Sequence, residues 1–152
     1  MNNLNSKKFI TEKIGIASDH AGFQLKNLTI NFLNGHMTVI DYGTDSENSV
    51  DYPDYAKKLS DAFKVKSVTF GILICGSGIG MSIYANRTPC IRAALCHNKT
   101  YAKLAREHND ANVLVLGARF LNFTEAKDII NTFFITKFLG NKHQIRVDKL
   151  KK

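Results

Sequence analysis

The sequence predicts an α/β fold of three layers, in which helices cover both faces of a five-stranded parallel sheet. Short apolar segments rich in β-branched residues alternate five times with segments that have a helical apolar period. A glycine-rich stretch, Cys75–Gly80, follows the third apolar segment, where a strand would turn into a helix. No composition break marks a linker. Residues 13–140 are therefore predicted to form one domain, between a flexible leader at 1–12 and a basic tail or helix at 141–152.

The composition is typical of a soluble globular protein. The chain has 152 residues, of which 44% are hydrophobic and 22% are charged, enough for one good core. No apolar run approaches the roughly 20 residues that cross a bilayer. The first twelve residues lack the apolar segment of a secretory signal. The three cysteines form no paired motif, which predicts free thiols in a reducing cytoplasm.

The net charge of +8 predicts attraction of a small anionic ligand. The basic residues are scattered along the chain, and aromatic residues do not interleave with them as they do in single-strand nucleic-acid binders. We therefore expect neither nucleic acid nor a membrane as a partner.

Five segments are predicted to be strands, because each is short, apolar and bounded by turn residues. They are Lys13–Ser18, Met37–Tyr42, Val68–Cys75, Cys90–Leu95 and Ala111–Leu116.

The segments between these strands are predicted to be helices, and each has an apolar face. In chain order the predicted faces are Ala21, Leu25, Leu28 and Phe32; Tyr55, Leu59, Ala62 and Phe63; Tyr101, Leu104, Ala105 and His108; and Ala126, Ile129, Ile130, Phe133 and Phe134. Met81–Ala85 can also be helical. Pro53 suits a first helical turn, Asn98 suits a cap, and Asn122 with Glu125 resembles a capping box.

The expected strand order is 2-1-3-4-5, which is common in doubly wound sheets of five strands. In this order the chain reverses between strands 1 and 3, and ligands bind at the carboxyl ends of those strands. Asp19 and His20 follow the first strand, and Cys75–Gly80 follows the third. The topology therefore predicts that these two loops lie side by side.

The glycine loop contains Gly76, Gly78 and Gly80, which can take positive φ and let a ligand approach the backbone closely. It is not a Walker loop, because no Gly-Lys-Ser/Thr follows. It is also a poor dinucleotide fingerprint, since that fingerprint usually follows the first strand and no acidic residue ends the next strand here. An anion-binding loop is the favoured interpretation, and a tightly packed turn is the alternative.

Cys75 lies where the third strand ends, beside this loop. A helix N-terminus and nearby cations favour the thiolate form of a cysteine, so a functional thiol is predicted. An inert buried thiol is the alternative. Cys90 and Cys96 lie in or beside a core strand and are predicted to be packing residues.

Asp19, His20 and His108 are further candidates, each with a plainer alternative. Asp19 could cap the first helix, His20 could be a surface residue, and His108 lies on an apolar helix face, as a core histidine would. Because His108 and Asn109 lie at the exit of their helix beside the fifth strand, we expect them near the same end of the sheet. The histidines lack metal-ligand spacing, so no metal site is predicted.

The basic tail brings Lys142, His143 and Arg146 onto one face if it is helical. This face is either a solvated basic surface or a phosphate clamp, with Arg146 as a planar fork and Lys142 as a point charge.

Eight separated motifs, spread between residues 13 and 148, resemble one family in sequence and spacing. They are Ser18–Gly22, Asp51–Pro53, Ile74–Gly80, Ala85–Asn86, Ile91–Ala93, Arg106–Val113, Gly117–Arg119 and His143–Val147. Together they are similar to the family of ribose-5-phosphate isomerase B, which the galactose-6-phosphate isomerase subunits share.

The resemblance implies an aldose–ketose isomerase on a Rossmann-like sheet, without metal or cofactor. It also implies a homodimer, or a tetramer made of two such dimers, with active sites that are shared between subunits. Cys75 matches the proton-transferring base and Ser77 a hydroxyl that assists it. Asp19 and His108 match residues that open the furanose ring. The other matches are substrate contacts: Gly76, Gly78, Ile79 and Gly80 around the enediolate oxygen; His20, Tyr52 and Asn109; and the phosphate-side residues Arg119, Lys142 and Arg146.

Departures from the family pattern are few. Another branch has Glu at the position of Met81, and since methionine cannot take a proton, Met81 fits Cys75 as the base. Lys142 stands where Arg is common, and Ser77 where Thr is also common. The resemblance places the reacting carbonyl, rather than the phosphate, at the glycine loop.

The expected function is interconversion of ribose 5-phosphate and ribulose 5-phosphate through an enediolate, a step of the pentose phosphate pathway. The alternatives are an isomerase of hexose 6-phosphates, such as allose or galactose phosphate, and a silent sugar-phosphate-binding protein.

Overall fold

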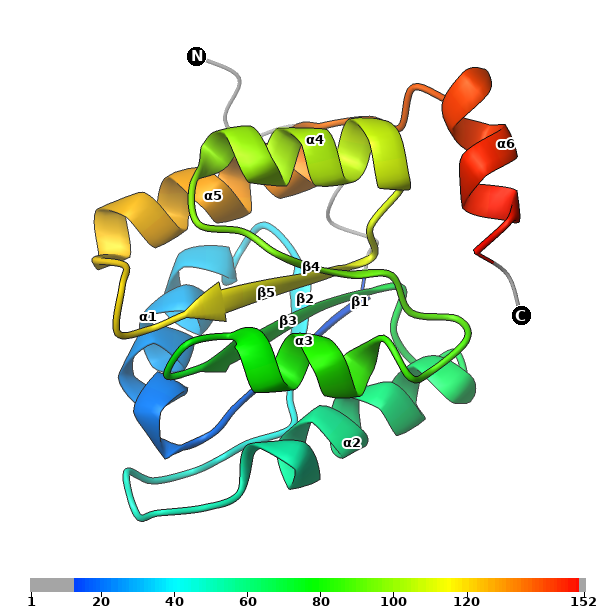
Figure 1. Ribbon diagram of the computed structural model, residues 1–152. Helices are drawn as coiled ribbons and strands as arrows, with labels where there is room; N and C mark the ends of the chain where they lie inside the picture. The colour runs from blue at the N-terminus through cyan, green and yellow to red at the C-terminus, as the bar shows by residue number, and fades with distance from the viewer. Residues whose placement is uncertain (1–12, 151–152) are drawn as a thin grey trace.

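The computed structural model describes residues 13–150 and confirms the three-layer α/β/α fold (Figure 1). All strand pairs are parallel, and the strands form one sheet. The strands are β1 (Lys13–Ser18), β2 (Thr38–Asp41), β3 (Phe70–Cys75), β4 (Ala93–Leu95) and β5 (Val113–Gly117). The predicted leader and the last two residues of the predicted tail lie outside the described residues.

The strand order is β2-β1-β3-β5-β4, so the predicted order 2-1-3-4-5 is wrong in its last two positions. Every residue of β5 is buried, and β5 pairs with β3 over five residues. β4 has only three residues, all half-buried, and Arg92 immediately precedes it. A strand in the middle of a parallel sheet is covered on both faces and needs a continuous apolar run, whereas a short edge strand does not. The more apolar strand therefore takes the inner position.

Two helical layers cover the sheet. On one face lie α1 (Phe23–Leu33), α4 (Lys99–Asn109) and α5 (Phe123–Ile135), whose buried side chains join one core cluster. On the other face lie α2 (Tyr52–Lys64) and α3 (Ile79–Ala85), which enclose a second cluster. A 3₁₀ turn, His20–Gly22, precedes α1. The last helix, α6 (Lys142–Asp148), packs on α4 (Figure 1).

The predicted helix boundaries hold where capping chemistry fixes them. Asn98 accepts hydrogen bonds from the backbone N–H groups of Thr100 and Tyr101 at the start of α4. Asn122 and Glu125 form the predicted capping box at the start of α5. Pro53 lies in the first turn of α2. Short-range hydrogen bonds of this kind can be read directly from the sequence.

Two predicted helix faces are partly wrong. In α4 the buried residues are Ala102, Ala105 and Arg106, whereas Tyr101 is 55% exposed and Leu104 is 42% exposed. Arg106 is buried because its guanidinium donates to Asp110 Oδ1 at 2.8 Å and to the Ala111 carbonyl at 2.6 Å.

In α1 the buried set includes Lys26 and Thr29 instead of Leu28. The ammonium of Lys26 donates to the Asp41 carboxylate at the end of β2. A paired charge can occupy a position that a hydrophobic pattern assigns to an apolar residue. The five predicted residues of α5, in contrast, are all buried.

The sheet has two edges at opposite ends of its parallel strands. We call the edge where the strands end the carboxyl edge and the opposite edge the amino edge. α4 begins near the carboxyl edge after β4 and runs back to the amino edge, where β5 starts, and α6 lies at that end of α4 (Figure 1).

Among the helices of residues 13–150, none combines the length and the apolar character needed to cross a membrane.

Candidate active site

The loops after β1 and β3 are in contact at the carboxyl edge, as the sequence predicts. The backbone N–H of Asp19 donates to the carbonyl of Ile74 at 3.2 Å. Gly22 lies so close to the same carbonyl that a Cβ at this position would approach the oxygen to 2.6 Å. Asp19, which follows β1, and Cys75, which ends the neighbouring strand β3, therefore border one site.

Cys75 is buried, and its sulfur is fixed by the glycine loop. The backbone N–H of Gly78 donates to Cys75 Sγ at 3.1 Å. Gly78 has φ of +79°, a conformation that glycine adopts at little cost. A hydrogen bond donated to sulfur stabilises a thiolate more than a thiol, because the charged form is the stronger acceptor.

Two side chains from other elements line the glycine loop. The ring of Tyr52, at the start of α2, lies against Gly80, where an added Cβ would be 2.5 Å from Tyr52 Cζ. The guanidinium of Arg119, just after β5, lies against Gly76, where an added Cβ would be 3.0 Å from Arg119 Cζ. The backbone N–H of Arg119 also donates to the Gly76 carbonyl at 3.0 Å. A phenol and a cation thus flank the loop beside Cys75.

The polar residues after β1 and β3 are anchored by hydrogen bonds to nearby backbone groups. Asp19 is buried, and its Oδ1 accepts the backbone N–H of Gly22 at 3.1 Å, which is the capping role weighed above. His20 Nδ1 lies 3.1 Å from the carbonyl oxygen and 3.2 Å from the backbone nitrogen of Val50. Ser77 Oγ accepts the N–H of Ile79 at 3.3 Å. These bonds leave one carboxylate oxygen of Asp19 and one ring nitrogen of His20 for a ligand.

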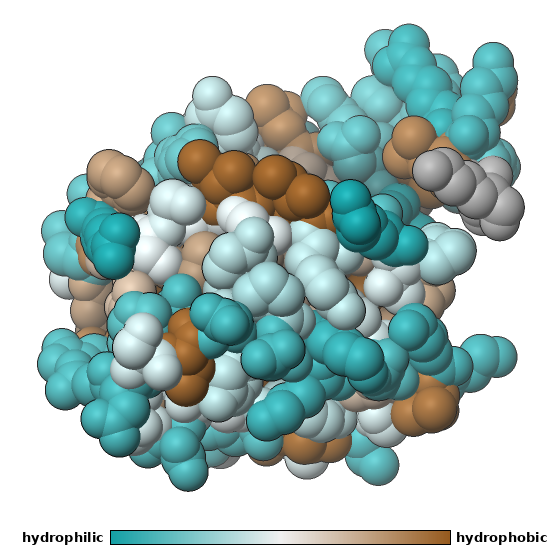
Figure 2. All heavy atoms as spheres, turned by 60° about the horizontal axis from the view of Figure 1, so that its bottom comes forward, coloured by the Kyte–Doolittle hydropathy of each residue, from teal (hydrophilic) through white to brown (hydrophobic). Residues whose placement is uncertain are grey.

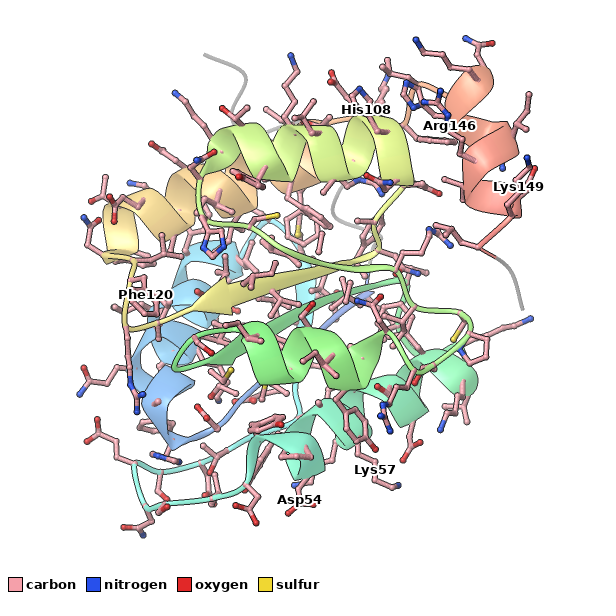
Figure 3. All side chains as sticks on the ribbon, in the orientation of Figure 1. Asp54, Lys57, His108, Phe120, Arg146 and Lys149 are labelled. Carbon is pink, nitrogen blue, oxygen red and sulfur yellow. The ribbon has the colours of Figure 1, made fainter. Side chains whose placement is uncertain are left out.

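The other predicted site residues lie at the amino edge. His108 and Asn109 end α4, and Lys142 and Arg146 lie on α6 (Figure 3). Figure 3 shows His108 and Arg146 near each other, at the end of the molecule away from Phe120, which follows β5 at the carboxyl edge. The expectation that His108 lies at the same end of the sheet as Cys75 is therefore wrong. A helix between parallel strands returns the chain to the amino end of the next strand, so its exit faces the amino edge.

An arginine pair fixes the end of α4. Asp110 has φ of +45° and accepts hydrogen bonds from Arg106 at 2.8 Å and from Arg92 at 3.0 Å. The Nε of Arg92 also donates to the carbonyl oxygens of Asn109 and Asp110, at 3.1 and 2.9 Å. The last turn of α4, which carries His108, is thus held by Arg92 and Arg106, and both guanidinium groups are ion-paired with Asp110.

α6 presents a different face from the one expected. His143 is 8% exposed and stacks on His108, with ring centroids 4.2 Å apart and ring planes 5° apart. Lys142 and Arg146 are exposed, whereas His143 is buried. Burial, the neighbouring imidazole of His108 and the cations Lys142 and Arg146 lower the pKa of His143 from 6.5. The apolar Val147, one turn after His143, was the sequence signal for this buried face.

The other two cysteines differ in environment. Cys96 is buried, and burial raises the pKa of its thiol to about 12, as expected of a packing residue. Cys90 is exposed, so the prediction that it is a packing residue is wrong. Within residues 13–150, no three His, Cys, Asp or Glu side chains are grouped as a metal site would require.

The chain is similar to proteins with known names over most of its length. It is 40% identical to ribose-5-phosphate isomerase B of Escherichia coli K12 over 140 residues, which cover 91% of this chain and 94% of that protein. A crystal structure of a ribose 5-phosphate isomerase from Thermotoga maritima superposes with a TM-score of 0.90 at 51% identity, covering 93% of this chain and 98% of that one.

Ribose 5-phosphate isomerase B from Anaplasma phagocytophilum gives a TM-score of 0.86 at 46% identity, with the same two coverages of 93% and 98%. A family model described as Ribose/Galactose Isomerase matches residues 14–150. Sequence, structure and family model agree, and the chain belongs to the ribose/galactose isomerase family.

Proposed function

We propose that this isomerase interconverts ribose 5-phosphate and ribulose 5-phosphate, with Cys75 as the base and without a metal ion. The observation that carries the proposal is the hydrogen bond from the Gly78 N–H to Cys75 Sγ, at the end of a strand and beside a loop of backbone donors. Relatives and structural neighbours named ribose-5-phosphate isomerase B support the choice of substrate.

In the proposed reaction Cys75 moves one proton between two neighbouring carbons. The thiolate takes the proton from C2 of the open-chain aldose, and negative charge develops on the carbonyl oxygen at C1. The backbone N–H groups of Ser77 and Gly80 make no hydrogen bond within residues 13–150, so they can receive this charge. One such donor typically contributes about 3–4 kcal/mol to the transition state. Cys75 then returns the proton to C1, while the C2 hydroxyl proton passes to the oxygen at C1, which leaves a hydroxyl at C1 and a ketone at C2.

Ring opening precedes this step, because the aldose is mostly a closed furanose. Asp19 and His108 are the groups proposed to move a proton from the anomeric hydroxyl to the ring oxygen. Tyr52, His20 and Asn109 would bind the sugar hydroxyls, and Arg119, Lys142 and Arg146 the phosphate. Since Cys75 and His108 lie at opposite edges of one sheet, a single chain cannot bring these groups to one substrate.

We propose that two copies pair, so that the amino-edge residues of one complete the carboxyl-edge site of the other. Exposed apolar side chains support such pairing. Figure 2 shows a strip of strongly apolar surface in the upper middle of the face, with smaller apolar patches elsewhere on it. Ile79 and Ile83 of α3, next to the glycine loop, are each more than half exposed. Tyr101 and Leu104 of α4 are exposed as well. Covering these side chains would remove apolar area from water.

Hexose 6-phosphates are the second candidate substrates, since the family description also names galactose. A longer sugar would need a larger separation between Cys75 and the phosphate-binding cations. The free thiols of Cys75, Cys90 and Cys96 favour a reducing compartment, the cytoplasm, as the place of action.

The test is interconversion of ribose 5-phosphate and ribulose 5-phosphate by purified protein in excess EDTA. Turnover under this condition is the expected result, because carbonyl polarisation is assigned to backbone donors. Activity that requires an added divalent metal would overturn the mechanism. Inactivity on pentose phosphates, with turnover of allose 6-phosphate or galactose 6-phosphate, would move the substrate to the hexose class. Binding without any turnover would leave a sugar-phosphate-binding protein.

A further inference from the structure

The stack of His108 and His143 is the closest ring pair among the described residues, and it joins two elements. His108 lies in the last turn of α4 and His143 in the first turn of α6. Their ring centroids are 4.2 Å apart and their planes nearly parallel, at 5°. Separations near this value give full van der Waals contact between two flat rings. His143 thus covers one face of His108.

Among residues 13–150, no group is hydrogen-bonded to the imidazole of His108, and its ring contact is the stack with His143. A catalytic histidine is commonly oriented by a carboxylate or carbonyl bonded to one ring nitrogen. In this chain a second imidazole covers the ring face instead, and both ring nitrogens of His108 remain available at the ring edge. Stacking fixes the plane of the ring without using either nitrogen.

The charges around the stack favour a neutral His143. The groups that act on it are His108 and Glu107 from α4, and Lys142 and Arg146 from α6 itself. Three of these four groups repel a positive charge on His143, and its burial opposes that charge as well. A neutral His143 places no positive charge against the ring of His108.

We propose that His143 is a positioning residue for ring opening, which holds the plane of the His108 ring by stacking on it. This inference rests on the proposed function and deepens it. His143 does not touch the substrate in this account. It acts only through His108, so its loss should affect the step that His108 performs and no other.

The chemistry of the two substrates separates that step from proton transfer by Cys75. Ribose 5-phosphate closes into a furanose and must be opened. Ribulose 5-phosphate stays open, because its 5-hydroxyl carries the phosphate and its 4-hydroxyl would close only a four-membered ring. A defect in ring opening therefore slows the aldose-to-ketose direction, while initial consumption of the ketose is spared.

The experiment measures kcat and KM in both directions for His143→Ala, His143→Phe and Val147→Ala, with His108→Ala as the reference for lost ring opening. His143→Ala should lower kcat for ribose 5-phosphate by about 10- to 100-fold and change ketose consumption less than about twofold. His143→Phe keeps a flat ring in the stack and should restore most of the forward rate. Val147 is the matched control, because it is the other buried residue of α6 and takes no part in the ring stack.

Val147→Ala should loosen α6 and raise KM equally in both directions, because Lys142 and Arg146 lie on that helix. The same symmetric pattern in His143→Ala would overturn the proposal and leave His143 as an anchor of α6. Unchanged kinetics in His143→Ala would overturn it as well. A Phe variant as slow as the Ala variant would overturn the stacking argument.

A spectroscopic readout is independent of turnover. The Hε1 proton of His108 should be shifted upfield by the ring current of His143. It should move downfield in His143→Ala and stay upfield in His143→Phe. An unchanged resonance in His143→Ala would refute the stack in solution. If the wild-type protein stacks but does not turn over ribose 5-phosphate, the proposed function fails, and the ring-opening role of His143 fails with it. An active wild type with an active His143→Ala variant overturns only the role of His143.

Discussion

Gly78 is the residue whose backbone N–H holds the sulfur of Cys75. Its positive φ turns the N–H back toward Cys75 Sγ at 3.1 Å, while Gly76 and Gly80 leave room for Arg119 and Tyr52. The three glycines therefore serve different purposes: one orients a donor and two admit neighbouring side chains. The sequence predicted that ligands approach this loop, and the structure adds that two of its glycines are covered by side chains of this chain.

Replacing Cys75 with Ala should lower kcat by at least about 100-fold, because the group that carries the proton is lost. Binding of ribose 5-phosphate should change little, since Arg119 and the basic residues of α6 remain. Cys75→Ser should be nearly as slow, because a hydroxyl in the same place does not ionise near neutral pH. Steady-state kinetics test this prediction. Cys90→Ala is the control, because Cys90 is a free and exposed cysteine that lies outside the glycine loop. A near-wild-type kcat for Cys75→Ala would remove Cys75 as the base.

His143 should make stability depend on pH. Its pKa in the folded state is lowered from 6.5, so near and below that pH the unfolded chain binds more protons than the folded one. The free energy of unfolding therefore falls as pH drops through 6.5 toward the folded pKa, and this contribution is fully present above 6.5. Urea unfolding at about pH 5.5 and about pH 7.5, at one protein concentration, should show a smaller difference for His143→Phe than for wild type. Equal differences would contradict the assignment.

Among the helices and strands, the features that depend on neighbouring residues in the sequence could be predicted from the sequence. Strands and caps are local, so Asn98, Asn122 and Glu125 marked helix starts that the structure confirms. The order of β4 and β5 depends on competition for one interior position, which no single segment reveals. The exposed side of α4 was also missed, because the buried Arg106 depends on Asp110 and Ala111 across a turn.

The predicted site residues lie at two opposite edges of the sheet because α4 carries the chain from the end of β4 to the start of β5. A strand–helix–strand unit carries the helix exit to the start of the next strand. His108 could have been assigned to the amino edge from the sequence alone. Its stacking on His143 could not, since that contact requires the path of residues 136–141 between α5 and α6.

α6 should contribute to binding more than to chemistry. Arg146→Ala should raise KM for ribose 5-phosphate by about 10- to 100-fold, the equivalent of one lost charge-assisted hydrogen bond to phosphate. The kcat value should change little, because the phosphate carries the same charge throughout the reaction. Gln144→Ala is a control on the same helix, since Gln144 is exposed and its side-chain amide donates to Asp148 of α6 itself. An unchanged KM for Arg146→Ala would exclude it from the phosphate site.

At the scale of the whole molecule, the proposed pairing makes a prediction that single variants cannot. Cys75→Ala and His108→Ala proteins should each be slow alone on ribose 5-phosphate. A mixed pair contains one site with both intact residues and one site with neither. After unfolding and refolding together at equal amounts, about a quarter of wild-type activity should return if reassortment is random. Mixing without subunit exchange is the control. No recovery after exchange would show that Cys75 and His108 act within one chain or not at all.

Because the two edges are far apart, each chain would contribute residues to two different active sites of the proposed pair. In the proposed pair, every subunit supplies Cys75 to one active site and His108 to the other. Neither subunit therefore contains a complete active site. Dilution then switches off catalysis without unfolding anything: separated chains keep their cores and their thiols but hold only half-sites. Specific activity should thus decline at concentrations below the pair's dissociation constant, while the folded fraction of each chain stays constant.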